Sequence, residues 1–416
     1  MKRIFSSTVP WSQRADVFLL ALALLGVLFH VLSESTRRLR PEPYLQAKMS
    51  AATRAVRCFE VIREHRLGAP VVVDLVNDPE GSGLIGEEFT LTTTDRGILD
   101  SKLTSVNPNF AALFVEYFED LGLEPGDPVA IAMTGSFPAL NICALVAAEE
   151  LSLLPLPITS VGASMWGAND PSFTWLDMES LLYQRGLIHT RSLAASLGGS
   201  NDRGRGLSPA GRSLLEDAIV RNGVPLIAEQ TLDESIAARI AILDAEAEPR
   251  GVRAYVNIGG GSASIGTSLD GGLIPSGPNV KLPDYNWTQR GALQHYGKRR
   301  VPIVHVLGLQ TLAKKHGFPV APETIPTVGE GTIFHQEVYD LKVVLPSLVL
   351  YALLCFGLLR SRNRAARAAR ERLVTSGLGL APSAPSAGAS SQPILPTVTE
   401  ANPATIRSVP DTIGRT

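Results

Sequence analysis

Two stretches rich in glycine and hydroxyl residues are the parts of the chain best suited to bind a ligand. The first holds three successive glycines and two serines, and it directly follows an apolar run at residues 252–258. Consecutive glycines cost backbone entropy, so they are kept where φ must be positive or where another group approaches the backbone. Bare N–H groups and hydroxyls suit an anion. An anion-binding loop and a ligand-free tight turn both fit, because the spacing is neither that of a P-loop nor GxGxxG.

The second stretch, Thr-Gly-Ser at 134–136, follows another apolar run and precedes Pro138. A serine just ahead of a proline is first of all a helix cap. The same geometry presents a hydroxyl and free N–H groups to a carboxylate or phosphate. A nucleophilic Ser136 is a further alternative, although the GxSxG elbow is absent. The ligand-binding candidates are Thr134, Gly135, Ser136, Gly259, Gly260, Gly261, Ser262 and Ser264.

Two other residues could support Ser136 in catalysis. His305 ends an apolar run and is a candidate base, but a structural histidine fits the same position. Asp74 precedes Asn77 and Asp78 near a glycine loop, where oxygen ligands for Mg²⁺ and an Asx turn are both consistent with the sequence. No zinc spacing is present. We therefore assign no metal site, and the sequence leaves the cofactor unknown.

The elements that must position these residues alternate between strands and helices. Apolar runs predict strands at residues 69–76, 129–133, 153–158, 224–228, 252–258 and 302–306. Helical periodicity predicts helices at 47–65, 107–123, 139–151, 175–185, 209–222, 231–247, 287–296 and 309–316. This alternation is typical of an α/β fold with a doubly wound, mostly parallel sheet. Ligands bind such sheets at the carboxyl ends of the strands, so the two stretches should converge there.

Two apolar segments, 17–33 and 341–359, flank this region and are predicted to be transmembrane helices. A cleaved signal peptide is the alternative for the first, but no small-x-small site follows closely. A buried core helix is the alternative for the second. Six arginines follow the second segment between 360 and 372, and residues 321–340 contain no Lys or Arg. The positive-inside rule therefore predicts cytoplasmic ends at 1–16 and 360–416 and an extracytoplasmic α/β domain at 34–340.

Charge follows the same division. Residues 1–16 carry a net charge of +2 and residues 360–416 carry +5, so the total of −2 leaves −9 for the segment between them. Basic ends around an acidic middle argue for a membrane partner and against nucleic acid. The tail beyond residue 375 is rich in Ala, Ser, Pro and Gly and is predicted to be disordered. Cys58 and Cys143 allow either one disulfide or two buried thiols.

Five segments carry a family resemblance. They are Gly83-Leu-Ile-Gly-Glu-Glu with Thr92-Thr-Thr, Asn107-Pro-Asn-Phe, Val129-Ala-Ile-Ala-Met-Thr-Gly-Ser-Phe-Pro-Ala-Leu-Asn, Ser164-Met-Trp-Gly-Ala and Asn257-Ile-Gly-Gly-Gly-Ser-Ala-Ser-Ile-Gly. Over residues 15–360 the chain resembles the poly-γ-glutamate system proteins, membrane components associated with poly-γ-glutamate synthesis. The resemblance implies an accessory role in making or exporting the polymer, with the synthase membrane subunits as partners. It implies no established reaction and no catalytic residues.

Three hypotheses follow. The first is a membrane-anchored accessory protein of poly-γ-glutamate biosynthesis or export, whose domain binds a small anion or a polymer end. The second is a membrane-anchored serine hydrolase or amidohydrolase. The third is a non-catalytic scaffold for the synthase.

Overall fold

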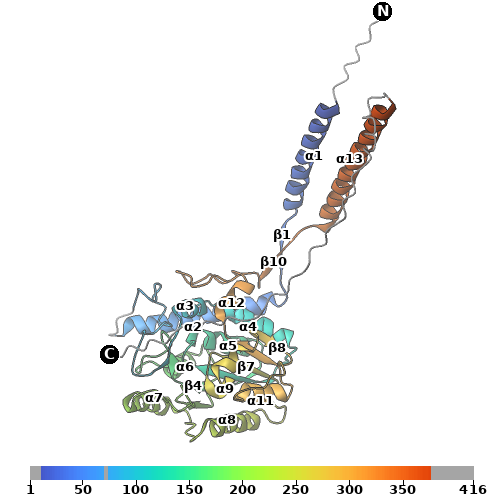
Figure 1. The fold of residues 1–416 in the computed structure, drawn as a ribbon. Coiled ribbons are helices and arrows are strands. Elements are labelled where there is room, and N and C mark those ends of the chain that lie inside the picture. The colour runs from blue at the N-terminus through green and yellow to red at the C-terminus, as the bar shows by residue number, and fades with distance from the viewer. Residues whose placement is uncertain (1–10, 70–73, 376–416) are drawn as a thin grey trace, which may run out of the picture. The chain divides into compact units, whose positions relative to one another are not determined.

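The computed structural model describes residues 11–69 and 74–375, and these form two units. One unit contains the long first and last helices, and the other is a globular unit, Ser33–Leu341. The helices are α1 Trp11–Glu34, α2 Leu45–Gly68, α3 Leu99–Ser105, α4 Asn109–Asp120, α5 Pro138–Glu150, α6 Trp175–Gln184, α7 Pro209–Arg221, α8 Leu232–Glu246, α9 Ser262–Ile265, α10 Ser268–Gly272, α11 Ala292–Lys298, α12 Leu309–Lys315 and α13 Leu341–Thr375 (Figure 1). The strands are β1 Arg38–Pro41, β2 Thr93–Asp95, β3 Pro128–Thr134, β4 Leu154–Ser160, β5 Ala163–Ser164, β6 Ala194–Ser196, β7 Ala254–Ile258, β8 Gly277–Asn279, β9 Ile303–Val306 and β10 His335–Val338.

The globular unit is built on a six-stranded sheet in the order β6-β4-β3-β7-β9-β8. All neighbouring strands are parallel except the edge pair β8 and β9. From β3 the chain moves outward to β4 and β6, and it then returns to place β7 and β9 on the other side of β3. The predicted α/β class with a mostly parallel sheet is confirmed, and the strand order reverses between β3 and β7.

The central strand β3 shows why the sheet needs cover on both faces. All seven of its residues are buried. Because side chains alternate along a strand, Val129, Ile131 and Met133 join one core cluster, which includes residues of α2, α4 and α5. Ala130 and Ala132 join a second cluster with residues of α8 and α11. A continuous apolar run, without polar alternation, is what a strand buried on both faces requires.

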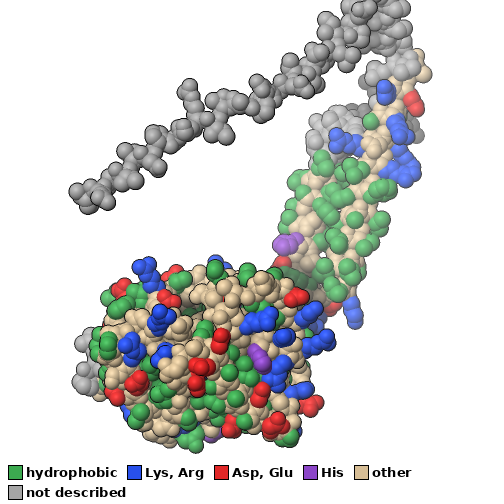
Figure 2. Space-filling model, turned by 60° about the horizontal axis from the view of Figure 1, so that its bottom comes forward, with side chains coloured by type: hydrophobic (Ala, Val, Ile, Leu, Met, Phe, Trp, Pro, Cys, Tyr) green, Lys and Arg blue, Asp and Glu red, His purple; other side chains and the backbone are tan. Residues whose placement is uncertain are grey.

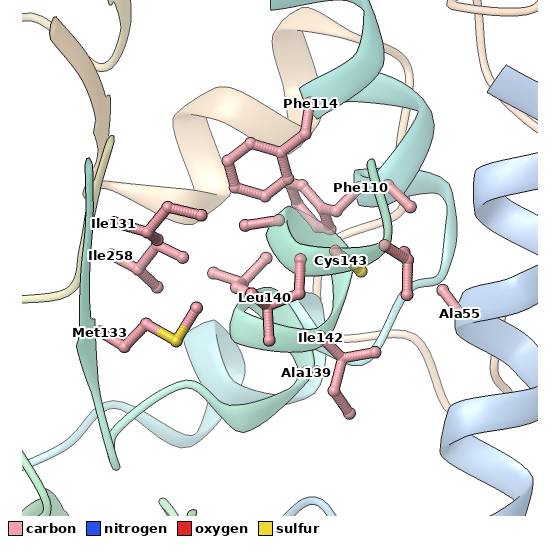
Figure 3. Close-up of a cluster of buried hydrophobic side chains, with 14 of the residues drawn as sticks. Ala55, Phe110, Phe114, Ile131, Met133, Ala139, Leu140, Ile142, Cys143 and Ile258 are labelled. Atoms are coloured by element: carbon pink, nitrogen blue, oxygen red, sulfur yellow. The ribbon is translucent and has the colours of Figure 1, made fainter. Parts of the chain in front are cut away.

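Helix α5 is apolar along its buried length apart from Asn141, because protein surrounds it. Eleven of its residues, Pro138–Ala148, are buried. Figure 3 shows Leu140 between the sheet residues Ile131, Met133 and Ile258 and the rings of α4. A helix packed on every side is hydrophobic on every side. This core fixes the helix directly after the Thr-Gly-Ser stretch.

Several predicted elements differ from the structure. Residues 224–228 form no strand; Leu226 makes one isolated bridge to Ala195, because the edge strand β6 is only three residues long. The helix predicted at 287–296 begins only at Ala292, where Gly291 is extended. Of the strand predicted at 69–76, residues 70–73 lie outside the described residues, and Asp74–Asn77 form a turn.

The two ends of the globular unit are tied together. Strands β1 and β10 pair antiparallel, with Arg38 opposite Val338. An exposed ion pair joins Arg38 Nη2 to Asp340 Oδ2 at 2.9 Å. The chain therefore enters and leaves this unit through adjacent strands.

The other unit contains two helices that are long and apolar enough to cross a membrane, Val17–Ser35 and Leu341–Arg372. The apolar part of neither helix is buried by protein. Phe29 of α1 packs edge-on against Tyr351 of α13, with 6.5 Å between ring centroids. Hydrophobic side chains cover both helices in Figure 2, and Lys and Arg side chains gather near one end of α13.

Candidate functional site

A cleft of about 960 Å³ lies along the carboxyl ends of the parallel strands. Its lining includes the last residues of β3 and β4 and residues directly after β7 and β9. Strands β3 and β7, between which the strand order reverses, are neighbours in the sheet. Crevices at such a reversal are where open α/β sheets bind ligands.

Hydroxyl groups dominate the lining. The serines and threonines are Thr94, Ser101, Thr134, Ser136, Ser160, Ser164, Ser200, Ser262, Thr267, Ser268 and Thr288. The ionisable lining residues are Asp95, Arg96 and Lys102, and only one of the three is a carboxylate. Such a surface can donate many hydrogen bonds to an anion and repels it little.

Five of the eight candidate ligand-binding residues line this cleft: Thr134, Ser136, Gly260, Gly261 and Ser262. Their convergence follows from parallel strands ending at one edge of the sheet. Thr134 Oγ1 donates to Ile258 O at 3.3 Å and so links the ends of β3 and β7. Ser262 Oγ donates to Gly199 O at 2.9 Å and links the glycine stretch to the loop after β6.

The other three candidates are fixed by packing, and none lines the cleft. A β-carbon at Gly135 would lie 2.3 Å from Val161 O. Gly259 has a φ of +83°, and a β-carbon there would lie 2.7 Å from Thr134 Oγ1. Ser264 is buried and its hydroxyl lies 2.9 Å from Tyr255 Oη. Glycine at 135 and 259 is therefore explained without a ligand.

Gly260 differs from these glycines. It is exposed, its φ is not positive, and the nearest atom to an added β-carbon is Ile265 Cδ1 at 3.9 Å. No contact or backbone angle in the described structure requires glycine here. No hydrogen bond within the described residues uses the N–H groups of Gly260 and Gly261.

The proposed catalytic partners of Ser136 are engaged elsewhere. His305 is fully buried, with Nδ1 3.2 Å from Asn257 Nδ2 and Nε2 3.2 Å from Gly271 O. Burial lowers the pKa of His305 to about 4, so the imidazole is neutral. Asp74 accepts N–H bonds from Val76 at 3.0 Å and Asn77 at 3.3 Å, which is an Asx-type turn. Within the described residues, neither His305 nor Asp74 contacts Ser136 through a hydrogen bond.

A lysine that the sequence did not single out occupies the cleft wall. Lys102 on α3 is only 2% exposed. Its Nζ donates to Ser136 O and to Ser164 Oγ, the latter at 2.8 Å, and lies 4.1 Å from the centroid of the Phe137 ring. Burial lowers the pKa of Lys102 from 10.5 to about 7. In the described part of the chain no carboxylate forms an ion pair with it.

A buried ion pair supports the cleft floor. Arg239 Nη2 lies 2.9 Å from Asp202 Oδ2, and both side chains are almost fully buried. The same guanidinium donates to Ser160 Oγ at 3.0 Å and to Ser196 Oγ at 2.6 Å. This network fixes the ends of β4 and β6, and the Arg239 charge is already matched by Asp202.

Comparisons with protein-family models, curated proteins and solved structures found no match. Across residues 11–69 and 74–375, no group of three or more His, Cys, Asp and Glu side chains could hold a metal ion. Cys58 and Cys143 are buried free thiols.

Proposed function

We propose that this protein is a membrane-anchored anion-binding protein and an accessory component of poly-γ-glutamate biosynthesis or export. The observation that carries the proposal is the cleft at the strand-order reversal, with its hydroxyl lining and the N–H groups of Gly260 and Gly261. Backbone amides and hydroxyls bind carboxylate and phosphate oxygens without adding a fixed charge. The family resemblance of the sequence supports the assignment to this pathway.

We further infer that the sheet is doubly wound. Helices α2, α4 and α5 share a core cluster with one face, and α8 and α11 share a second cluster with the other. In the central order β4-β3-β7-β9, the later strands are added first on one side of β3 and then on the other. In that winding the cleft is the site where a ligand is expected.

The orientation that we propose places the globular unit outside the membrane and both termini in the cytoplasm. Six arginines follow the apolar part of α13, and none precedes it within residues 321–340. Positive charge of this kind is retained on the cytoplasmic side. The apolar surfaces of α1 and α13 are where the synthase membrane subunits would dock.

The overall charge favours capture of a polymer end rather than binding along a chain. Residues 17–359 carry a net charge of −9, which repels a polyanion in bulk. Binding must then depend on local donors, and one terminal γ-glutamyl unit offers carboxylates that fit them. A phosphate fits the same donors, so the test below includes both anions.

The test measures binding of a synthetic oligo-γ-glutamate to the full-length protein in detergent micelles by calorimetry. A Gly260→Val substitution places a branched side chain at the cleft surface, and we expect at least about tenfold weaker binding, or about 1.4 kcal/mol. Gly68→Val is the matched control, since Gly68 is also exposed, has no neighbour within 4 Å and lies outside the cleft. Absence of binding to the wild type, or equal affinity of the Gly260 variant, refutes the proposal. Competition by inorganic phosphate alone would identify a phosphate ligand instead.

A further inference from the structure

Lys102 and Ser164 form a pair that the proposed binding function does not use. Lys102 Nζ lies 2.8 Å from Ser164 Oγ, and both residues line the cleft. Lys102 is buried, whereas Ser164 is half-buried and open to a ligand. A buried amine is thus in hydrogen-bond contact with an accessible hydroxyl.

The backbone holds Ser164 in place. Ser164 belongs to β5, which pairs with β2, and its N–H donates to Ser136 Oγ at 3.0 Å. Its carbonyl accepts the N–H of Gly167 at 2.9 Å. Ser136, the nucleophile suggested by the sequence, is therefore a positioning residue for Ser164.

The surroundings of Lys102 favour a neutral amine. The Phe137 ring covers the Nζ, and the charged groups on neighbouring elements are exposed: Asp95 and Arg96 at the cleft rim, Asp100 on α3 itself, and Lys314 and Lys315 on α12. Burial alone lowers the pKa of Lys102 to about 7, so a large fraction of the amine is unprotonated at neutral pH. A neutral amine accepts a proton, and an ammonium group does not.

A structural role explains this arrangement poorly. A buried cation without a carboxylate partner is costly, and a neutral polar side chain could make the same two hydrogen bonds. Lysines whose pKa is lowered by burial in a cleft are candidates for proton transfer. Serine activated by lysine is a known variant of the serine nucleophile.

We propose that Ser164 is a nucleophile and Lys102 its general base, and that the pair cleaves or transfers an amide or ester bond of an anionic substrate. Ser164 Oγ would attack the carbonyl carbon while its proton passes to Lys102 Nζ. The bond from that carbon to the leaving nitrogen or oxygen then breaks, and the Lys102 ammonium returns the proton to the leaving group. Water or a second amine then attacks the acyl carbon and gives a proton to Lys102 Nζ. The ester bond to Ser164 Oγ breaks, and the Lys102 ammonium returns that proton to Ser164 Oγ.

Only the anionic character of the substrate rests on the proposed function. The Phe137 ring lies 4.1 Å from Lys102 Nζ, and its Cδ2 would lie 3.3 Å from a β-carbon at Gly259. The ring thus stands between the amine and the glycine stretch. The proposed substrate therefore has a carboxylate a few bonds from its acyl carbon, as a γ-glutamyl amide does, with the anion at the glycine stretch and the carbonyl at Ser164.

The first test labels the full-length protein in micelles with an uncharged fluorophosphonate and maps the modified residue by mass spectrometry. We expect the probe to modify Ser164 and labelling to be lost completely in Ser164→Ala. The labelling rate of Lys102→Arg should be at least about 100-fold below that of the wild type, because arginine keeps a cation that cannot act as a base. Ser213→Ala, an exposed serine on α7, is the control and should label like the wild type. The wild-type rate should rise with pH through about 7 as Lys102 loses its proton.

Modification at Ser136 or at Lys102, no modification of the folded wild type, or a wild-type rate in a folded Lys102→Arg variant overturns the assignment. Thermal unfolding of each variant shows whether it is folded, and the small Ser164→Ala change keeps the test valid if Lys102→Arg unfolds. Hydrolysis of mono-p-nitrophenyl succinate should exceed that of p-nitrophenyl butyrate; the reverse order refutes the anionic substrate. Oligo-γ-glutamate binding on the same preparations separates the two proposals, because labelling without binding refutes only the anion site, and binding without labelling refutes only the Ser164–Lys102 pair.

Discussion

Replacing Lys102 with Met should stabilise the folded protein at neutral pH. Burial lowers the pKa of Lys102 to about 7, from 10.5 for a lysine in water. At about 1.4 kcal/mol for each tenfold change in the protonation equilibrium, holding the ammonium form in the folded protein costs about 5 kcal/mol. Methionine has a similar length and no charge, so the variant avoids this cost.

The substitution also removes two hydrogen bonds, those from Lys102 Nζ to Ser136 O and to Ser164 Oγ. Both serines are half-buried, so water can replace the amine in part, and each lost bond destabilises by about 1 kcal/mol. The expected net gain is about 2–3 kcal/mol, or a rise in Tm of about 5 °C for a domain of this size.

This gain should depend on pH in a defined direction. Between about pH 7 and pH 10.5 the unfolded chain binds a proton at Lys102 that the folded protein does not, so wild-type stability rises with pH in this window. Below about pH 7 the lysine is protonated in both states and its cost is complete. The advantage of Lys102→Met is therefore largest below pH 7 and shrinks by about 1.4 kcal/mol for each pH unit above it.

Thermal unfolding of the full-length proteins in one detergent, between about pH 6 and pH 9, measures this difference. Lys314→Met is the control, because Lys314 is exposed on α12 and its loss should not change the pH dependence. A Lys102→Met variant that is less stable than the wild type at pH 6, or a stability difference that stays constant up to pH 9, would contradict the reasoning.

Three further predictions concern other parts of the molecule. Asp202→Asn should lower the free energy of unfolding by about 3–5 kcal/mol, because it leaves the buried Arg239 without its ion-pair partner. Asp244→Asn, which removes an exposed ion pair, should lower it by less than about 1 kcal/mol. Denaturant titration compares the two variants, and equal losses would show that the buried network does not stabilise the fold. Cys58 and Cys143 should react with maleimide only after unfolding, since both are buried and burial raises the pKa of Cys58 to about 12; rapid native labelling counts against the described core. Protease added to the outside of intact cells should leave the tail at 360–416 uncut, and cleavage there would reverse the proposed orientation.

The sequence predicted an element correctly where a local hydrophobic pattern alone determined it. The strands β3, β4, β7 and β9 were predicted because apolar runs buried on both faces end at glycine, proline or hydroxyl residues. The short strands were missed: β6 has three residues, Ala194–Ser196, and the edge strand β8 is Gly277–Asn279. Such strands carry no hydrophobic pattern and exist only because a neighbour offers an unpaired edge.

Some residues of the candidate site could likewise be predicted from the sequence, and others could not. Ser136 and Gly260 could be expected at one cleft because each follows a parallel strand. Lys102 could not be found in this way, since a single lysine in a short helix is usually solvent-exposed. Its burial comes from Phe137 and Ser164, which are distant in sequence, and only the tertiary structure brings these residues together.

Because β1 pairs with β10, the globular unit is an insertion whose two ends are adjacent. Arg38 and Val338 are opposite each other, so their Cα atoms are about 5 Å apart. One or two residues can bridge such a gap. The 299 residues between them could thus be replaced by a tight turn, and the chain would still connect its two apolar helices through a short hairpin. In topological terms, the whole segment that forms the cleft is an insertion in the connection between two apolar helices.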